Sequence, residues 1–138
     1  MVQIPLLIGP SGANGGAVTL VLVADDSLPS GSPVIISRAN GHIQKADAAV
    51  KPKSFVIGLL GAASAAGFGA TLVIDALTMS DWTAVTGSQL LAVGQPYFLG
   101  VGGGLTTTVP GAPNCLTRVG MAVTPNELLI NPNPPIQQ

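Results

Sequence analysis

Charged residues are scarce in this sequence. Five lysines and arginines and six aspartates and glutamates account for 8% of its 138 residues, and the formal net charge is -1. A typical globular domain has about 25% charged residues. A folded monomer of 13.7 kDa exposes on the order of 6,600 Å² of surface, which is roughly 600 Å² for each charged residue. We therefore expect much of the surface to face other protein or a membrane.

Reactive side chains are equally few. Cysteine and histidine occur once each, as Cys115 and His42, which excludes an intrachain disulfide and a zinc site made of these residues. The neighbours of Cys115 provide no activating base, so we expect a structural thiol. Catalysis by proton transfer or by a nucleophile needs a positioned base and acid. The sequence therefore indicates a protein that is not an enzyme, with no catalytic residue, cofactor or metal.

Basic stripes and long helical segments are also missing. The cations form one local cluster, Lys45, Lys51 and Lys53, so we expect no nucleic-acid partner. Residues 54–74 carry no charge, as a membrane span would. The longer run 82–117 is equally uncharged, however, and its prolines and glycines exclude a helix. Absence of charge marks no single segment, and we expect no membrane partner. No basic residue precedes the apolar N-terminus, which argues against a secretory signal.

Short apolar runs predict antiparallel strands in the C-terminal part of the chain. Glycines and prolines separate four such runs, at residues 96–99, 105–109, 117–123 and 128–130. Alternation within the third run places three side chains on one face: Val119, Met121 and Val123. In the fourth run, Leu128 and Ile130 face away from Leu129. The prolines at 132, 134 and 135 then rule out further regular structure.

Three more strands are predicted upstream. Residues 17–24 are apolar on both faces, which is typical of a strand covered on both sides. Residues 55–60 and 70–79 predict two further strands. The connection at 61–69 is rich in small residues, and its alanines could also form one short helical turn.

A hairpin is predicted around Asn40-Gly41, which is the strongest short-range signal for a two-residue turn. The flanking strands span residues 33–39 and 42–46. This register pairs Arg38 with Ile43 and Ile36 with Lys45. It leaves His42 exposed beside the turn, without an acid–base role.

Some acidic side chains leave two interpretations open. Asp25-Asp26 could bind a metal, but the ligand spacing of a calcium loop is missing, so a solvated turn is favoured. Asp75 would share a face with the apolar residues two positions away on either side. If that face is buried, the carboxylate needs a cation, and the candidates are Arg38, Lys45 and Arg118. The alternative is an edge position in water.

Two aromatic residues are candidates for protein contact. Ser80-Asp81-Trp82 resembles a helix cap, and Gly87 follows closely, so one short helix is predicted near residues 80–86. Trp82 and Tyr97 combine a large ring with a polar group. Both are expected either in the core or at a contact between subunits, and no second tryptophan completes a sugar-binding site.

The N-terminal residues 1–16 are predicted to form an arm. Residues 2–10 are apolar, and Pro5 and Pro10 exclude a helix and disfavour a central strand. Exposing these side chains to water is unfavourable, so we expect the arm to contact neighbouring protein. The candidate contact residues are Ile4, Leu6, Leu7 and Ile8. An ordinary first strand of the domain is the alternative.

The order of several short motifs resembles a known family. The motifs are Tyr97-Phe98-Leu99-Gly100, the glycines at 102–104, Leu105-Thr106-Thr107, Pro110, Val119-Gly120-Met121-Ala122 and Leu128-Leu129-Ile130. Upstream they are Ala46-Asp47-Ala48, Phe55-Val56-Ile57-Gly58, Ala66-Gly67, Trp82 and Gly87. Over residues 45–131 the chain resembles small β-rich virion proteins of tailed bacteriophages, the head-decoration and fibre-head modules.

The strand pattern and the resemblance together define what we expect. The pattern predicts an all-β fold, a compact antiparallel β-barrel or sandwich over residues 17–131, with a C-terminal tail at 132–138. The resemblance implies a structural virion protein, a capsid decoration or cement protein that binds the major capsid protein and stabilises the phage head. It implies a location on the capsid surface of a virion assembled in the host cytoplasm.

The resemblance also bears on assembly. Such modules sit at local threefold positions, so a homotrimer is expected over a dimer. The alternative function is a tail or head fibre component involved in host attachment. A fibre would be expected to contain a long repetitive stalk, and this sequence contains none.

Overall fold

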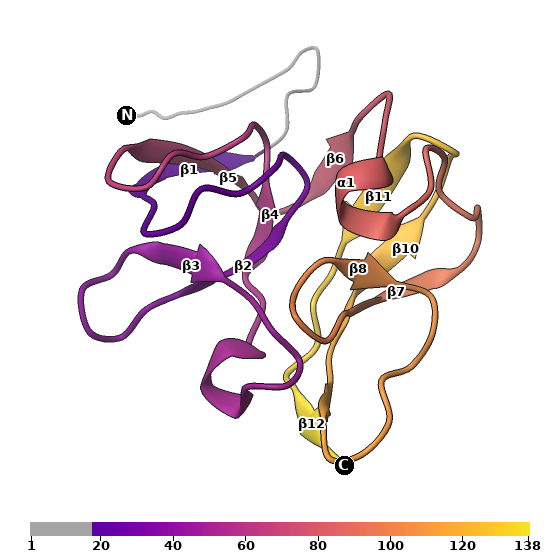
Figure 1. Cartoon of the computed structure of the whole chain (residues 1–138). Coiled ribbons are helices and arrows are strands. Elements are labelled where there is room, and N and C mark those ends of the chain that lie inside the picture. Colours follow the sequence, from indigo (N-terminus) through magenta and orange to yellow (C-terminus); the bar gives the residue numbers. More distant parts are fainter. Residues whose placement is uncertain (1–17) are drawn as a thin grey trace.

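The computed structural model describes residues 18–138. The predicted arm, with Ile4, Leu6, Leu7 and Ile8, lies outside the described residues. Within them the fold is all-β and sandwich-like, as predicted, with twelve short strands in three antiparallel sheets (Figure 1). A single short 3₁₀ turn, η1 (Lys51–Lys53), and a single short α-helix, α1 (Thr83–Thr86), complete the part of the chain that the structure describes.

The first sheet contains the N-terminal strands, in the spatial order β1-β5-β4-β2-β3. Their bounds are β1 Thr19–Val23, β2 Pro33–Ile36, β3 Ile43–Lys45, β4 Gly58–Leu60 and β5 Gly69–Val73. The second sheet has the order β6-β11-β10-β7-β8. Its strands are β6 Ala76–Thr78, β7 Pro96–Leu99, β8 Leu105–Thr106, β10 Arg118–Ala122 and β11 Glu127–Ile130. The third sheet pairs β9 (Cys115–Leu116) with β12 (Ile136–Gln137).

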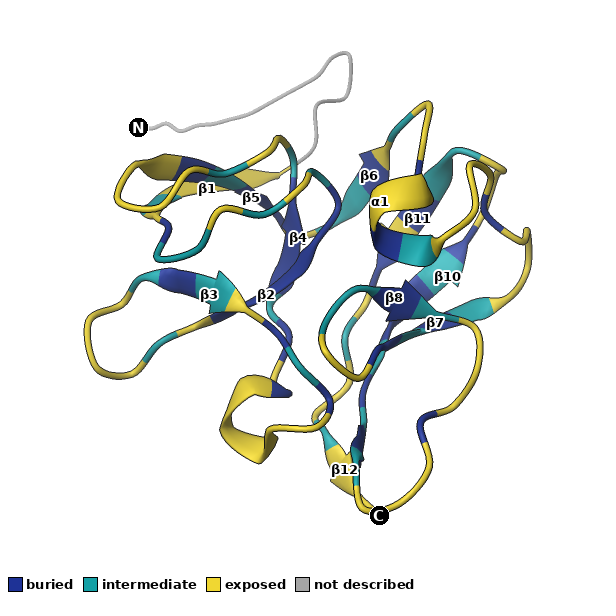
Figure 2. Ribbon diagram, in the orientation of Figure 1, coloured by how far each residue is buried: buried dark blue, intermediate teal, exposed yellow. Residues whose placement is uncertain are grey.

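Two apolar clusters explain why strands of the first sheet are apolar at consecutive positions. Leu59 and Val73 belong to the main core, which also takes side chains from the second sheet. Leu60 and Leu72, their neighbours along the strands, belong to a second cluster with residues from β2 and β3. Successive side chains of a strand point to opposite faces, so β4 and the end of β5, at Leu72 and Val73, are buried on both faces (Figure 2).

The predicted strand at residues 70–79 is wrong as a single element. The chain leaves the first sheet after Val73 and enters the second at Ala76. Asp75 lies at this crossing, where its Oδ1 accepts hydrogen bonds from the backbone N–H of Val18 (3.0 Å) and Ala76 (2.8 Å). The charge therefore interacts with backbone donors that the crossing leaves unpaired. Of the two predicted alternatives, the structure is nearer to an edge position in water, because Asp75 is partly exposed and directly precedes β6, an edge strand of the second sheet.

The hairpin at Asn40-Gly41 is present, but its register and its turn differ from the prediction. Ile43 pairs with Ile36 instead of Arg38. The loop contains the four residues 38–41, closed by a hydrogen bond between the flanking residues (2.9 Å). The Asn40 side chain accepts from the backbone N–H of His42 (3.0 Å), an Asx-turn that mimics a backbone turn. Gly41 has φ 74, as the prediction requires.

The predicted face of strand 117–123 is interrupted by a β-bulge. The register of β10 against β7 shifts between Arg118 and Gly120. A bulge changes which side chains point inward. Val119 and Ala122 are buried as a result, whereas Met121 is only partly buried. In β11 no bulge intervenes, and the predicted alternation of Leu128, Leu129 and Ile130 is confirmed.

The remaining differences concern element ends. The helix predicted near 80–86 is confirmed as α1, with Asp81 Oδ1 accepting from the backbone N–H and the hydroxyl of Thr83 (2.9 and 2.6 Å). The connection 61–69 contains turns and no helix. The prediction that the prolines after 131 exclude regular structure is wrong, because β12 follows the last of them. Pro135 lacks an N–H, but the residues after it can pair.

Candidate interaction surfaces

Among residues 18–138, strand β1 is an edge of the first sheet. It pairs with β5 on one side, and on the other side the chain meets β3 only beyond its end, through a bridge between Ala24 and Ile43. Val21 is 71% exposed, and Val18, Leu20 and Val23 are also exposed. The predicted cover on both faces of this strand is therefore not found among the residues that the structure describes.

Apolar residues beside β1 extend this exposed area. Phe68, which precedes β5, is 70% exposed, and Ile74, which follows β5, is exposed as well. Edge strands are usually protected from pairing by charges, prolines or bulges. Residues 18–23, VTLVLV, contain neither charge nor proline. We call this set the β1 surface: Val18, Leu20, Val21, Val23, Phe68 and Ile74.

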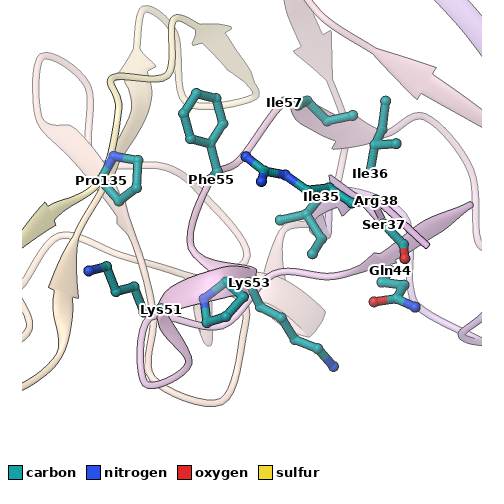
Figure 3. Close-up of a pocket in the computed structure, with 11 residues that line it drawn as sticks. Ile35, Ile36, Ser37, Arg38, Gln44, Lys51, Lys53, Phe55, Ile57 and Pro135 are labelled. Atoms are coloured by element: carbon teal, nitrogen blue, oxygen red, sulfur yellow. The ribbon is translucent and has the colours of Figure 1, made fainter. Parts of the chain in front are cut away.

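A second surface is a pocket of ≈ 630 Å³ beside β2, β3 and η1 (Figure 3). Three of the five cations of the chain line it, and no acidic residue does. Phe55, which is 57% exposed, provides an apolar wall. We call it the cationic pocket. Its lining residues are Ile35, Ile36, Ser37, Arg38, Gln44, Lys51, Pro52, Lys53, Phe55, Ile57 and Pro135.

A polar network holds the turn after β1 against the β2–β3 hairpin. Asp25 accepts from Gln44 Nε2 (2.8 Å) and lies 2.7 Å from His42 Nδ1. Hydrogen bonds from Gln44 first, and then from His42 and Asn40, hold the pKa of Asp25 below its usual value. Each carboxylate oxygen is engaged with protein, which is typical of a structural turn. Within residues 18–138 no group of three or more acidic, histidine or cysteine side chains could hold a metal ion.

The aromatic candidates lie in the core. Trp82 is 0% exposed, and its Nε1 donates to the backbone oxygen of Asn126 (3.0 Å). Tyr97 is buried, and its hydroxyl accepts from the backbone N–H of Ala92 (2.8 Å). The sequence left two interpretations open, the core and a contact between subunits. In the structure both residues belong to the main core. Cys115 is a buried free thiol, consistent with the structural role expected.

The two surfaces contain residues that the sequence did not single out. Phe68 stands between Gly67 and Gly69, and a large aromatic residue flanked by glycines is a signal that could have indicated exposure. Phe55 and Arg38 could not have been assigned to one pocket, because they are distant in sequence. Among the described residues no helix has the length and apolar character needed to cross a membrane.

No protein-family model matches the chain, and no curated protein matches it. Its function must therefore be inferred from these surfaces and from the resemblance of its motifs.

Proposed function

We propose that this chain is a structural protein of a phage virion, a decoration or cement protein that binds the capsid and stabilises the head. The observation that carries the proposal is the β1 surface. Residues 17–24 have the composition of a strand buried on both faces, yet Val21 and its neighbours are exposed in the single chain. Exposed apolar side chains gathered along one edge strand favour a contact with other protein.

The chemistry of β1 fits pairing with an extended segment. An edge strand offers unpaired backbone N–H and C=O groups, and an added strand can accept and donate to them while its side chains cover the alternate faces. Full burial of a valine or leucine side chain contributes about 1.5–3 kcal/mol. Association itself costs at least about 4 kcal/mol. Several side chains of the β1 surface must therefore be buried together for a stable contact.

The low charge supports an assembled setting. Eleven charges over a surface of 6543 Å² leave large areas that interact weakly with water, which suits a small module packed among other subunits. The resemblance supplies the identity of the neighbours: copies of this chain, with a trimer favoured, and the major capsid protein. The same chemistry would serve a fibre component, so location on the particle separates the two functions.

The test is a low-resolution image of phage particles assembled in the presence of the protein. We expect extra density on the head lattice at local threefold positions, and its loss from particles assembled without the protein. Density confined to a tail or head appendage would replace decoration with a role in a fibre. Particles that carry no density for the protein would contradict both structural roles.

A further inference from the structure

The geometry points to the cationic pocket as the binding site for an acidic segment of a partner protein that inserts an apolar side chain beside Phe55. This contact is separate from the one proposed for the β1 surface. It rests on the proposed function only because it assumes that the partner is a protein. The pocket lies over β2, β3 and η1, and no residue of the β1 surface lines it. The two contacts can therefore be tested separately.

The charge of the pocket is not balanced within the described part of the chain. Arg38, Lys51 and Lys53 line it, and no acidic residue does; the contact of 2.7 Å between His42 Nδ1 and Asp25 Oδ1 involves none of these three cations. Three like charges around one pocket repel one another, and a ligand with carboxylates would relieve that repulsion. In a protein with only five cations, their concentration here favours an anionic partner.

The apolar residues of the pocket favour a ligand that carries an apolar side chain as well as negative charge. Phe55 is exposed above a floor formed by Ile35, which is buried, and Ile57, which is partly buried. Pockets of about 300–1,000 Å³ that are lined by apolar side chains and a few polar groups accommodate whole side chains of a ligand. Figure 3 shows the end of the Arg38 side chain beside Phe55, whereas Lys51 and Lys53 lie at the margin of the pocket with their side-chain ends directed away from Phe55. The arrangement fits an apolar side chain beside Phe55 with carboxylates that reach Arg38 and the two lysines.

Nucleic acid fits the pocket less well. Binding of single strands uses several aromatic residues on which successive bases stack, along a positively charged groove. The pocket offers one aromatic ring, Phe55, and the chain as a whole has a net charge of -1. An acidic protein segment needs only a local cluster of cations.

The test is a titration of the full-length protein with fluorescent peptides, read by anisotropy. The first peptide has acidic residues on both sides of a central phenylalanine. The second replaces each acid with its amide, and a single-stranded oligothymidine serves as a competing anion. We expect the amide peptide to bind at least about tenfold more weakly. Raising the salt from about 50 mM to about 500 mM should weaken binding of the acidic peptide.

Matched variants localise the binding. Lys53→Glu should weaken binding of the acidic peptide at least about tenfold, because it reverses one charge of the pocket. Lys45→Glu makes the same change in net charge at an exposed cation outside the pocket, and should leave affinity within about twofold. Val21→Arg, on the β1 surface, should also leave it unchanged. A failure of the pocket is therefore distinguishable from a failure of the proposed function.

Amide chemical shifts give a second measurement that does not depend on a variant. On addition of the acidic peptide we expect shifts at Ser37, Phe55 and Ile57, and none at Val21. Equal binding of the amide peptide would overturn the proposal, as would equal losses in Lys53→Glu and Lys45→Glu. Tighter binding of the oligothymidine than of the acidic peptide would assign the pocket to nucleic acid instead.

Discussion

Replacing Gly120 with alanine should strongly destabilise the protein. Gly120 lies in β10, is buried, and pairs with Ile130 of β11. A Cβ at this position would lie 2.0 Å from the backbone oxygen of Leu129, 3.0 Å from its carbonyl carbon and 3.3 Å from Ile130 Cα. All three are backbone atoms of the paired strand, so no side-chain rotation can relieve the overlap.

The magnitude follows from what must move. Overpacking of a core costs about 1–3 kcal/mol where side chains can adjust. Here β10 and β11 must separate, so we expect the free energy of unfolding to fall by about 3–5 kcal/mol. This loss is at the upper end of what single substitutions cause. The free energy of unfolding of a protein of this size is about 5–15 kcal/mol. The melting temperature of Gly120→Ala should therefore be roughly 10–20 °C lower than that of the parent.

Gly111→Ala is the matched control. No atom lies within 4 Å of a Cβ at Gly111, its φ is not positive, and the residue is exposed. The substitution should change stability by less than about 1 kcal/mol, in the stabilising direction, because it restricts the unfolded chain. Thermal and urea unfolding measure both variants. Equal melting temperatures for Gly120→Ala and Gly111→Ala would refute the pairing of β10 with β11.

Further predictions concern the hairpin, the core and acid stability. Gly41→Val should lower stability by about 1–3 kcal/mol through its φ of 74 alone, since no atom lies within 4 Å of a Cβ there; an unchanged melting temperature would show a different turn. Trp82→Phe removes the N–H donor to the Asn126 carbonyl and leaves a cavity. The free energy of unfolding measured in urea should therefore fall by about 2–4 kcal/mol. An unchanged midpoint of urea unfolding would contradict the buried hydrogen bond. Hydrogen bonds hold the pKa values of Asp25 and Asp81 below 3.8 in the folded state, so their contribution to stability is present above that value and is lost as the pH falls through the folded pKa. The variant with asparagine at both positions should therefore lose less stability than the parent between about pH 5 and pH 2, and parallel pH profiles would contradict this.

The sequence predicts strands best where alternation is regular and no bulge interrupts the pairing. Leu128 and Ile130 face inward opposite Leu129 as predicted, because β11 lies between two strands without a bulge. At Gly120 the alternation fails, since a bulge depends on the partner strand and leaves no signal in the apolar pattern. The crossing at Asp75 was missed for a related reason. An apolar run shows that residues are buried, but not in which sheet.

The candidate surfaces show the same limit. Residues 17–24 have the apolar pattern of a strand covered on both faces, whereas Val18, Leu20, Val21 and Val23 are exposed among residues 18–138. A sequence does not say which residues cover a strand. The cationic pocket joins β2, η1 and Pro135, which are far apart in sequence. Lys51 and Lys53 were visible as a cluster, whereas the contribution of Arg38 required the tertiary structure. Trp82 and Tyr97 were identified as important, and their hydrogen bonds to the backbone explain why the core contains them.

The central claim is that other protein covers the β1 surface on the phage head. Val21→Arg places a charge in the middle of this surface, while Val101→Arg makes the same change at a valine that is 58% exposed in the loop after β7. Titration of undecorated heads with each protein, with the copies bound per head counted, measures the effect. Losing the burial of Val21 and adding an unpaired charge should weaken attachment by at least about 1.4 kcal/mol for each copy, a factor of ten in affinity. We expect that loss for Val21→Arg and unchanged attachment for Val101→Arg. Equal attachment of the two variants would contradict the claim.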